Sequence, residues 1–280
     1  MIPDVRTYLR PARMPHILCP GCGHGIVLGA LLRAFHRLRL NPDQIALVAG
    51  IGCSSRLVGY VDVCTLHTTH GRALAFATGL KLARPELTVV VLTGDGDGLG
   101  IGGNHLIHAA RRNIDLTCIL FNNAVYGMTG GQLAPTTPQE GVASTAPYGN
   151  IEPPFDSCKL MMGAGATFVA RGLAYEPLAL EEMIARGLVH RGFSFIEVIT
   201  DCPEYYGRYN QLGKGPEMLM SQKRRTMDIM EILATKRFVV RDRPEVRAWN
   251  LPYRLGILHE EERPEFSQVC WQMVAGREMV

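Results

Sequence analysis

Short apolar runs that end in glycine alternate along most of the chain with segments of helical periodicity. The runs in QIALVAGIGCSS, LTVVVLTGDGDG, IDLTCILFNN and FSFIEVIT are continuous, as expected for strands buried on both faces of a parallel sheet. Helices are predicted in GIVLGALLRAF, GRALAFATGLKLARP and GGNHLIHAARRN, where apolar residues recur at helical spacing. This pattern predicts an α/β fold, a parallel sheet with helices on both faces.

Two regions depart from the alternation. Residues 129–160 are rich in Gly, Pro, Ser and Thr, and a long irregular stretch inside a compact domain is typical of a functional loop. After Cys202 the alternation stops: SQKRRTMDIMEILATKR reads as one helix and residues 241–280 as a polar, irregular C-terminal tail. We therefore expect a ligand-binding domain over residues 1–215, and a helix and tail over 216–280 that pack on that domain or on a partner.

The composition is that of a soluble globular enzyme. Of the 280 residues, 47% are hydrophobic and 20% charged, and the net charge of +3 is too small to indicate nucleic acid as a partner. No apolar stretch is long enough to span a membrane, and the first residues lack the apolar segment of a secretory signal. A cytoplasmic location is therefore expected, where the eight cysteines serve as metal ligands, catalytic groups or buried residues rather than in disulfides.

The segment ILCPGCGHG holds Cys19 and Cys22 two residues apart, just before a predicted helix. Such a pair is compatible with a disulfide switch, half of a zinc site or part of an iron–sulfur site. The sequence around it leaves these three alternatives open. His24 follows the pair and is expected to cap the helix, with contact to a bound cofactor as the alternative.

Polar side chains follow two successive predicted strands. Asp95 lies in a glycine turn after one strand, and Asn123 follows the next. A βαβ crossover brings both to the carboxyl ends of neighbouring parallel strands, where open α/β sheets bind ligands. Carboxylate and amide oxygens suit Mg²⁺, and the glycine backbone and the following helix suit a diphosphate. The sequence therefore predicts a Mg²⁺–diphosphate site.

A dinucleotide site is the rival interpretation, because Gly98, Gly100 and Gly103 match GxGxxG. That fold requires an acidic residue at the end of the second strand. Here Asp115 precedes the strand, which ends in Asn122 and Asn123, so this interpretation is disfavoured. A glycine-rich turn without any ligand is disfavoured too, because so many glycines are conformationally costly.

The segments GDGDGLGIGGNH and NNAVYGMTGGQ together resemble the thiamine diphosphate signature of the beta subunits of 2-oxoacid:ferredoxin oxidoreductases. The resemblance implies the thiamin diphosphate-binding fold of the diphosphate-binding type. It implies that Asp95, Asn123 and the carbonyl of Val125 are the Mg²⁺ ligands. It also implies a set of cofactor-binding residues, namely Ser54, His70, Gly94, Gly96, Asp97, Tyr126, Gly127 and Thr129.

The same resemblance implies one [4Fe-4S] cluster, with Cys19, Cys22, Cys53 and Cys202 as its ligands. Cys53 and Cys202 each follow a predicted strand at the edge that carries Asp95 and Asn123, so four thiolates gathered there suit a cubane. Zinc is disfavoured because its structural sites usually take two paired knuckles, and only the first pair is one. The remaining cysteines are expected to be structural: Cys64, Cys118, Cys158 and Cys270.

The implied reaction is the CoA-dependent oxidative decarboxylation of a 2-oxoacid, foremost 2-oxoglutarate to succinyl-CoA and CO₂. Electrons then pass through the cluster to ferredoxin. Arg56 is a candidate for binding the substrate carboxylate, because arginine pairs with carboxylates through two hydrogen bonds. The glutamate that thiamine enzymes need beside the pyrimidine ring is expected on the pyrimidine-binding domain of an alpha subunit, in an (αβ)₂ assembly.

Three alternatives remain at this stage. Pyruvate:ferredoxin oxidoreductase beta subunits share the motifs, so the substrate is open. A non-redox thiamine-dependent carboligase would share Asp95 and Asn123 but needs no cysteine cluster. A zinc-stabilised nucleotide-binding module would bind NAD in place of thiamine diphosphate.

Overall fold

The computed structural model describes residues 4–224, 226–228 and 253–277. An eight-stranded sheet forms its centre, in the order β2-β1-β3-β4-β8-β7-β10-β9. The strands are β1 Ile45–Ala49, β2 Cys64–His67, β3 Thr88–Gly94, β4 Leu116–Asn122, β7 Phe168–Leu173, β8 Phe193–Ile199, β9 Thr226–Asp228 and β10 Tyr253–Glu260. All neighbouring pairs are parallel except β10, which runs antiparallel to β7. A separate small hairpin pairs β5 Val125–Tyr126 with β6 Gln132–Leu133.

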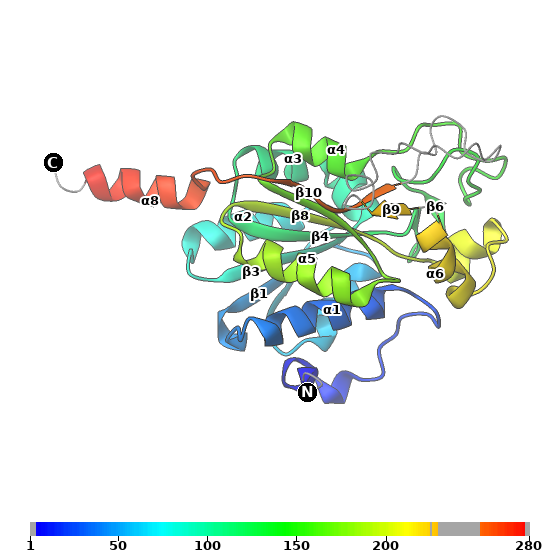
Figure 1. Cartoon of the computed structure of the whole chain (residues 1–280), viewed down its shortest axis with the longest axis horizontal. Coiled ribbons are helices and arrows are strands. Elements are labelled where there is room, and N and C mark those ends of the chain that lie inside the picture. The colour runs from blue at the N-terminus through cyan, green and yellow to red at the C-terminus, as the bar shows by residue number, and fades with distance from the viewer. Residues whose placement is uncertain (1–3, 225, 229–252, 278–280) are drawn as a thin grey trace.

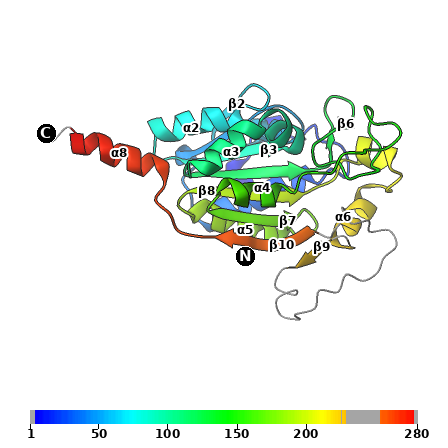
Figure 2. The same cartoon turned by 90° about the horizontal axis from the view of Figure 1, so that it is seen from above.

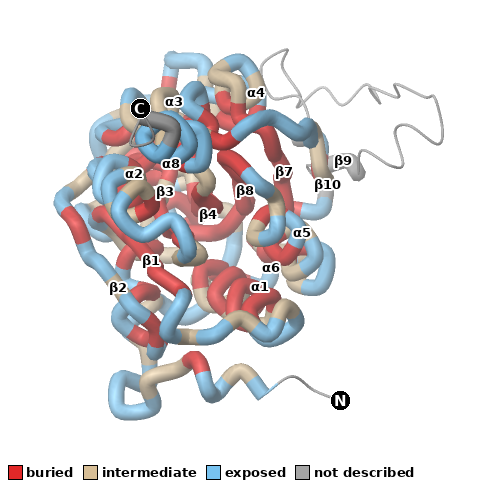
Figure 3. Tube along the Cα trace, turned by 90° about the vertical axis from the view of Figure 1, so that its left-hand side faces the viewer, coloured by how far each residue is buried: buried red, intermediate tan, exposed pale blue. Residues whose placement is uncertain are grey.

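Helices cover both faces of this sheet (Figure 1). The described helices are α1 His24–Arg37, α2 Ala73–Ala83, α3 Gly103–Arg111, α4 Ser157–Ala164, α5 Pro177–Val189, α6 Gly215–Arg224 and α8 Phe266–Arg277. One apolar core joins α1 and α5 to one side of the strands, and a second joins α2, α3 and α4 to the other. Seen along the sheet, buried residues fill both layers (Figure 3). The α/β fold predicted from the continuous apolar runs is confirmed.

Alternate residues of each central strand point into different cores. On β3, Val90 and Leu92 belong to the core under α1 and α5, whereas Val89 and Val91 belong to the core under α2 and α3. All of them are buried. A strand covered on both faces has no polar side to present, which explains why these segments read as uninterrupted apolar runs.

The C-terminal part differs from the expected helix and irregular tail. Residues 215–224 form α6, but residues 226–228 form β9 instead of continuing the helix predicted over 221–237, and residues 229–237 lie outside the described part. Farther along, β10 joins the main sheet at β7 and α8 projects from the end of the molecule opposite β6 and α6 (Figure 2). The tail prediction is wrong for residues 253–277, because unpaired backbone groups along β7 are satisfied by β10.

The sequence analysis also missed β2, β7, α4 and α5. In β7 the reason is visible, since Arg171 lies in the middle of FVARGL and is buried. Its guanidinium pairs with Glu197 on β8 and with Asp156, which caps α4. Glu197 is 0% exposed and also accepts a hydrogen bond from Asn122 Nδ2 at 2.8 Å. Among the described residues, no helix has both the length and the apolar content needed to cross a membrane.

The Arg171–Glu197 pair leads to a stability prediction. We expect Glu197→Gln to lower the free energy of unfolding by about 3 kcal/mol, because a buried guanidinium loses one of its charge partners. The matched control is Glu182→Gln, which breaks the half-exposed pair between Glu182 and Arg37 and should cost below about 1 kcal/mol. Urea unfolding of both variants measures the difference. Equal stability of the two would contradict a structural role for the buried pair.

Candidate active site

Four neighbouring parallel strands bring the predicted residues to one edge of the sheet. The strands β1, β3, β4 and β8 lie side by side. Cys53 follows β1, Asp95 follows β3, Asn123 follows β4 and Cys202 follows β8. The predicted meeting of these side chains at the carboxyl ends of neighbouring strands is therefore observed, and it places them where open α/β sheets bind ligands.

A single cavity at this edge gathers most of the predicted site. Its lining includes Cys53, Ser54, His70, Gly94, Asp95, Gly96, Asp97, Asn123, Val125, Tyr126, Gly127 and Thr129. His24, Ile51, Gly52, Phe121 and Met128 line it as well. Arg56 does not: it lies on the short helix Ser54–Tyr60 with an exposed side chain.

Asp95 is a buried carboxylate without a positive partner in the described part of the chain. It is 2% exposed. Its Oδ1 accepts a hydrogen bond from the amide of Gly96 at 2.8 Å, and its Oδ2 accepts one from Thr136 Oγ1 at 2.6 Å. Burial raises the pKa of Asp95 to about 6, against the opposing effect of these hydrogen bonds. A cation at this position would offset the cost of burying the charge.

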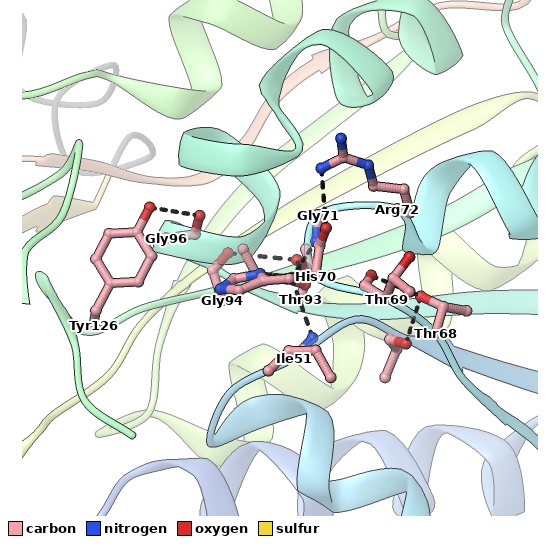
Figure 4. Close-up of polar contacts among 12 residues, drawn as sticks. Ile51, Thr68, Thr69, His70, Gly71, Arg72, Thr93, Gly94, Gly96 and Tyr126 are labelled. Carbon is pink, nitrogen blue, oxygen red and sulfur yellow. Dashed lines mark hydrogen bonds and ion pairs between the residues drawn. The ribbon is translucent and has the colours of Figure 1, made fainter. Parts of the chain in front are cut away.

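Unlike Asp95, Asp97 has a carboxylate that accepts hydrogen bonds from several separate segments of the protein. It accepts hydrogen bonds from the amides of Ile51 at 3.2 Å and Gly71 at 2.7 Å, and from Thr93 Oγ1 at 2.7 Å. His70 Nδ1 lies 2.6 Å from Asp97 Oδ1. Because a carboxylate only accepts, Nδ1 donates, and Nε2 remains as the second polar atom of a ring that lines the cavity. Figure 4 shows His70, Thr93 and Ile51 converging on this point.

The glycine turn after β3 packs against the ring of Tyr126. The segment Gly96–Ile101 forms a π-helical turn before α3. Tyr126 donates a hydrogen bond from its hydroxyl to the carbonyl of Gly96 at 2.9 Å (Figure 4). A Cβ on Gly96 would lie 2.3 Å from that ring, so only glycine fits. The helix expected after the glycine turn therefore begins with this π-helical segment, and α3 itself starts at Gly103.

The sulfurs of the four predicted cluster ligands lie close enough to affect one another. Burial raises the pKa of the Cys22 thiol to about 12, and the neighbouring sulfurs of Cys53, Cys202 and Cys19 add to the rise. Burial raises the pKa of the Cys53 thiol to about 11, and the neighbouring sulfurs of Cys202 and Cys19 add to the rise. The sulfurs of Cys202 and Cys53 lie 3.5 and 3.6 Å from the position of a Cβ at Gly127. Gly127 therefore lies beside these two thiols and also lines the cavity, as Cys53 does.

The other four cysteines lie away from this group. Cys118 and Cys158 are completely buried in the core under α2, α3 and α4. Cys64 is exposed on β2, and Cys270 is partly exposed on α8. Their structural role stays a prediction, and burial supports it for two of them.

His24 corrects one expectation. It is the first residue of α1, but no side-chain hydrogen bond caps that helix. The ring is buried, its Nδ1 lies 3.0 Å from Cys22 Sγ, and it packs against Phe121. The expected cap is therefore wrong, and His24 instead links the thiols to the cavity wall.

Two site residues had no signal that the sequence analysis used. Thr93 lies inside an apolar strand, and Thr136 lies in the irregular stretch after β6. Both hydroxyls donate to the aspartates of the glycine turn. The acceptor of a threonine hydroxyl can be identified only from the tertiary structure, because the sequence does not show which groups lie beside it.

Comparisons with known proteins agree with this geometry. Residues 47–198 match the family model described as thiamine pyrophosphate enzyme, C-terminal TPP binding domain. The 2-oxoglutarate synthase subunit KorB of Methanothermobacter marburgensis is 55% identical over 221 residues, which cover 79% of this chain and 78% of that protein. KorB of Methanocaldococcus jannaschii is 53% identical over 222 residues, or 79% of this chain and 82% of that protein.

A solved structure is similar over nearly the whole chain. It is a 2-oxoglutarate:ferredoxin oxidoreductase from Magnetococcus marinus with 2-oxoglutarate, coenzyme A and succinyl-CoA bound. The TM-score is 0.84 at 32% sequence identity, covering 98% of this chain and 90% of that one. The chain belongs to the thiamine pyrophosphate enzyme family and, within it, to the beta subunits of 2-oxoacid:ferredoxin oxidoreductases.

Proposed function

We propose that this chain is the beta subunit of a 2-oxoglutarate:ferredoxin oxidoreductase that forms succinyl-CoA and CO₂ and passes electrons to ferredoxin. The observation that carries the proposal is the position of Gly127. Its backbone lines the cavity that holds Asp95 and Asn123, and two cysteine sulfurs lie within 3.6 Å of its Cβ position. A redox centre at the thiols would be next to a cofactor in the cavity.

The cavity fits thiamine diphosphate and Mg²⁺. Asp95 supplies one buried carboxylate, Asn123 an amide oxygen and Val125 a carbonyl, which suits a cation that completes its shell with phosphate and water. Gly94, Gly96, Gly127 and the backbone of Asp97 are proposed to surround the diphosphate. Bound thiamine diphosphate would supply the decarboxylation chemistry, while the protein positions it and excludes water.

The thiol group fits a [4Fe-4S] cluster better than a zinc ion. In the described residues, no three His, Cys, Asp or Glu side chains converge closely enough to hold a single metal ion. Structural zinc sites usually take two paired knuckles and only Cys19 and Cys22 form one, so Cys19, Cys22, Cys53 and Cys202 are proposed as cluster ligands. The raised pKa values of the Cys22, Cys53 and Cys202 thiols mean that binding iron to them must release protons.

His70 and Ser54 are proposed to bind the cofactor, and Arg56 to bind the substrate carboxylate. His70 Nδ1 donates to Asp97, which orients the ring and leaves Nε2 as its second polar atom at the cavity. Ser54 lines the same wall, and Arg56 lies two residues farther along the same helix. Arg56 forms no ion pair with another described residue and remains a candidate for the substrate carboxylate. Thr129 already donates its hydroxyl to Gln132 Oε1 at 2.6 Å, so we propose that it holds the diphosphate through its backbone.

A partner subunit is proposed to complete the site. The apolar side chains of Ile51 and Met128 line the cavity and are 38% and 46% exposed, which suits a covering surface. The expected partner is an alpha subunit that contributes the pyrimidine-binding domain and its glutamate, in an (αβ)₂ assembly with CoA as a substrate. We propose a cytoplasmic location, where cysteines remain available as metal ligands.

The test is an assay of the enzyme coexpressed with its partner subunit and purified without oxygen. With CoA present, we expect reduction of ferredoxin by 2-oxoglutarate, and slower or no reduction by pyruvate and indolepyruvate. Faster turnover of pyruvate would support the pyruvate alternative. A colourless, iron-free enzyme would favour the carboligase alternative, and no reduction by any substrate would overturn the proposal.

A further inference from the structure

Thr136 holds the carboxylate of Asp95 from the side of the long loop after β6. The side chain of Thr136 is 1% exposed, and its Oγ1 lies 2.6 Å from Asp95 Oδ2. The hydroxyl donates this hydrogen bond to the carboxylate oxygen. Together with the Gly96 amide on Oδ1, this bond fixes the rotation of the carboxylate.

Thr137, the next residue, holds the other metal-binding segment. It is 0% exposed, and its Oγ1 donates to the carbonyl of Ala124 at 2.7 Å while it accepts from the amide of Ala134 at 2.9 Å. Ala124 stands between Asn123 and Val125 and has a φ of 62°, which is uncommon for a residue with a Cβ. Such a conformation persists only where neighbouring contacts enforce it.

The loop is itself fixed by contacts away from the cavity. Asn150 Nδ2 donates to the carbonyl of Thr137 at 2.8 Å, and the amide of Phe155 donates to the carbonyl of Pro135 at 2.9 Å. Asn210, eight residues after Cys202, exchanges two hydrogen bonds with the backbone of Val142. The two threonines are therefore held in place from both sides.

We propose that Thr136 and Thr137 are positioning residues that clamp the Asp95 turn and the Asn123–Val125 turn into one Mg²⁺-binding arrangement. The proposal rests on the proposed function, because it concerns the same cofactor site. It gives the irregular stretch over residues 129–160 a defined role. One adjacent pair of hydroxyls sets the distance between ligands that come from two different strands.

The test measures binding instead of turnover. The complete enzyme complex, freed of cofactor, is titrated with thiamine diphosphate by calorimetry at a series of Mg²⁺ concentrations. Thr136→Val keeps the shape but removes the donor, and we expect the Mg²⁺ concentration for half-saturation to rise roughly 10- to 100-fold. Thr136→Ser keeps the donor and should restore binding to within about threefold of the wild type, since only a methyl group is lost.

A second pair and a control separate positioning from folding. Thr137→Val should weaken Mg²⁺ binding and Thr137→Ser should restore it. Thr117→Val removes a buried hydroxyl that donates to the carbonyl of Gly187 at 3.0 Å, on the same strand as Asn122 but away from the cavity. It should lower the melting temperature without changing Mg²⁺ dependence. If Thr136→Val does not fold, Thr136→Ala removes the same donor without a second methyl group.

The outcomes distinguish the two proposals. Weaker Mg²⁺ binding in Thr136→Val or Thr136→Ala, with rescue by Thr136→Ser, supports the clamp. Wild-type Mg²⁺ dependence in the Val or Ala variant overturns the clamp and leaves the proposed function standing. If the wild-type complex binds no thiamine diphosphate at any Mg²⁺ concentration, the proposed function and the clamp both fail.

Discussion

Replacing Cys53 with alanine is expected to remove the iron–sulfur cluster while leaving the binding of thiamine diphosphate intact. The sulfur of Cys53 lies close to Cys202, and the two flank the same side of Gly127. Losing one of four thiolates leaves a cubane with an open iron and no substitute ligand, because alanine cannot coordinate. Ferredoxin reduction should therefore fall to background, even though the proposed Mg²⁺ and diphosphate ligands are unchanged.

Iron content and the visible absorption of the anaerobically purified protein measure this loss. Cys64→Ala is the matched control, since Cys64 is exposed on β2 and belongs to no thiol group in the described structure. The control should retain the iron of the wild type. If Cys53→Ala retained it as well, Cys53 would not be a cluster ligand.

The sequence predicted the placement of four candidate residues correctly, because strand topology alone decides it. Cys53, Asp95, Asn123 and Cys202 each follow a buried strand, and parallel pairing of those strands is sufficient to bring them to one edge. Neither a side-chain rotamer nor a loop conformation is needed for that conclusion. The resemblance to the oxidoreductase beta subunits then supplied the cofactors that this edge would hold.

Sequence analysis failed where a buried polar partner lies far away in the chain. Arg171 interrupts the apolar pattern of β7, and its partner Glu197 is on another strand, so the pattern of β7 alone did not predict a strand. His24 looked like a helix cap because its contacts with Cys22 and Phe121 require the tertiary fold. The strand β10 carries Arg, His and Glu beside apolar residues, which is typical of an edge that is only partly covered.

Gly127 lies next to both the cysteine thiols and the proposed cofactor site, so the Cys53→Ala variant has a counterpart at Asp95. If the cluster and the cofactor occupy adjacent but separate ligand sets, each must be removable without the other. The Cys53→Ala variant removes one of the proposed cluster ligands. The Asp95 carboxylate is the buried charged group among the proposed Mg²⁺ ligands, with 2% exposure.

Asp95→Ala is accordingly expected to abolish Mg²⁺-dependent binding of thiamine diphosphate and to leave the iron content unchanged. It deletes the only carboxylate among the proposed Mg²⁺ ligands, so the loss should exceed the roughly 10- to 100-fold cost of changing an outer-shell partner. Asp95→Asn keeps the shape and one oxygen but loses the charge, and it should bind more weakly than the wild type. Calorimetry with thiamine diphosphate at saturating Mg²⁺ measures both variants.

Stability must be separated from binding in this experiment, because the buried carboxylate is costly in the absence of a cation. Burial raises the pKa of Asp95 to about 6, so removing the charge relieves a penalty in the cofactor-free protein. We therefore expect cofactor-free Asp95→Asn to unfold at the wild-type temperature or above it, while binding is weakened. A variant that bound thiamine diphosphate as the wild type does would show that the Mg²⁺ ligand lies elsewhere. A variant that lost its iron together with the cofactor would contradict two separate ligand sets.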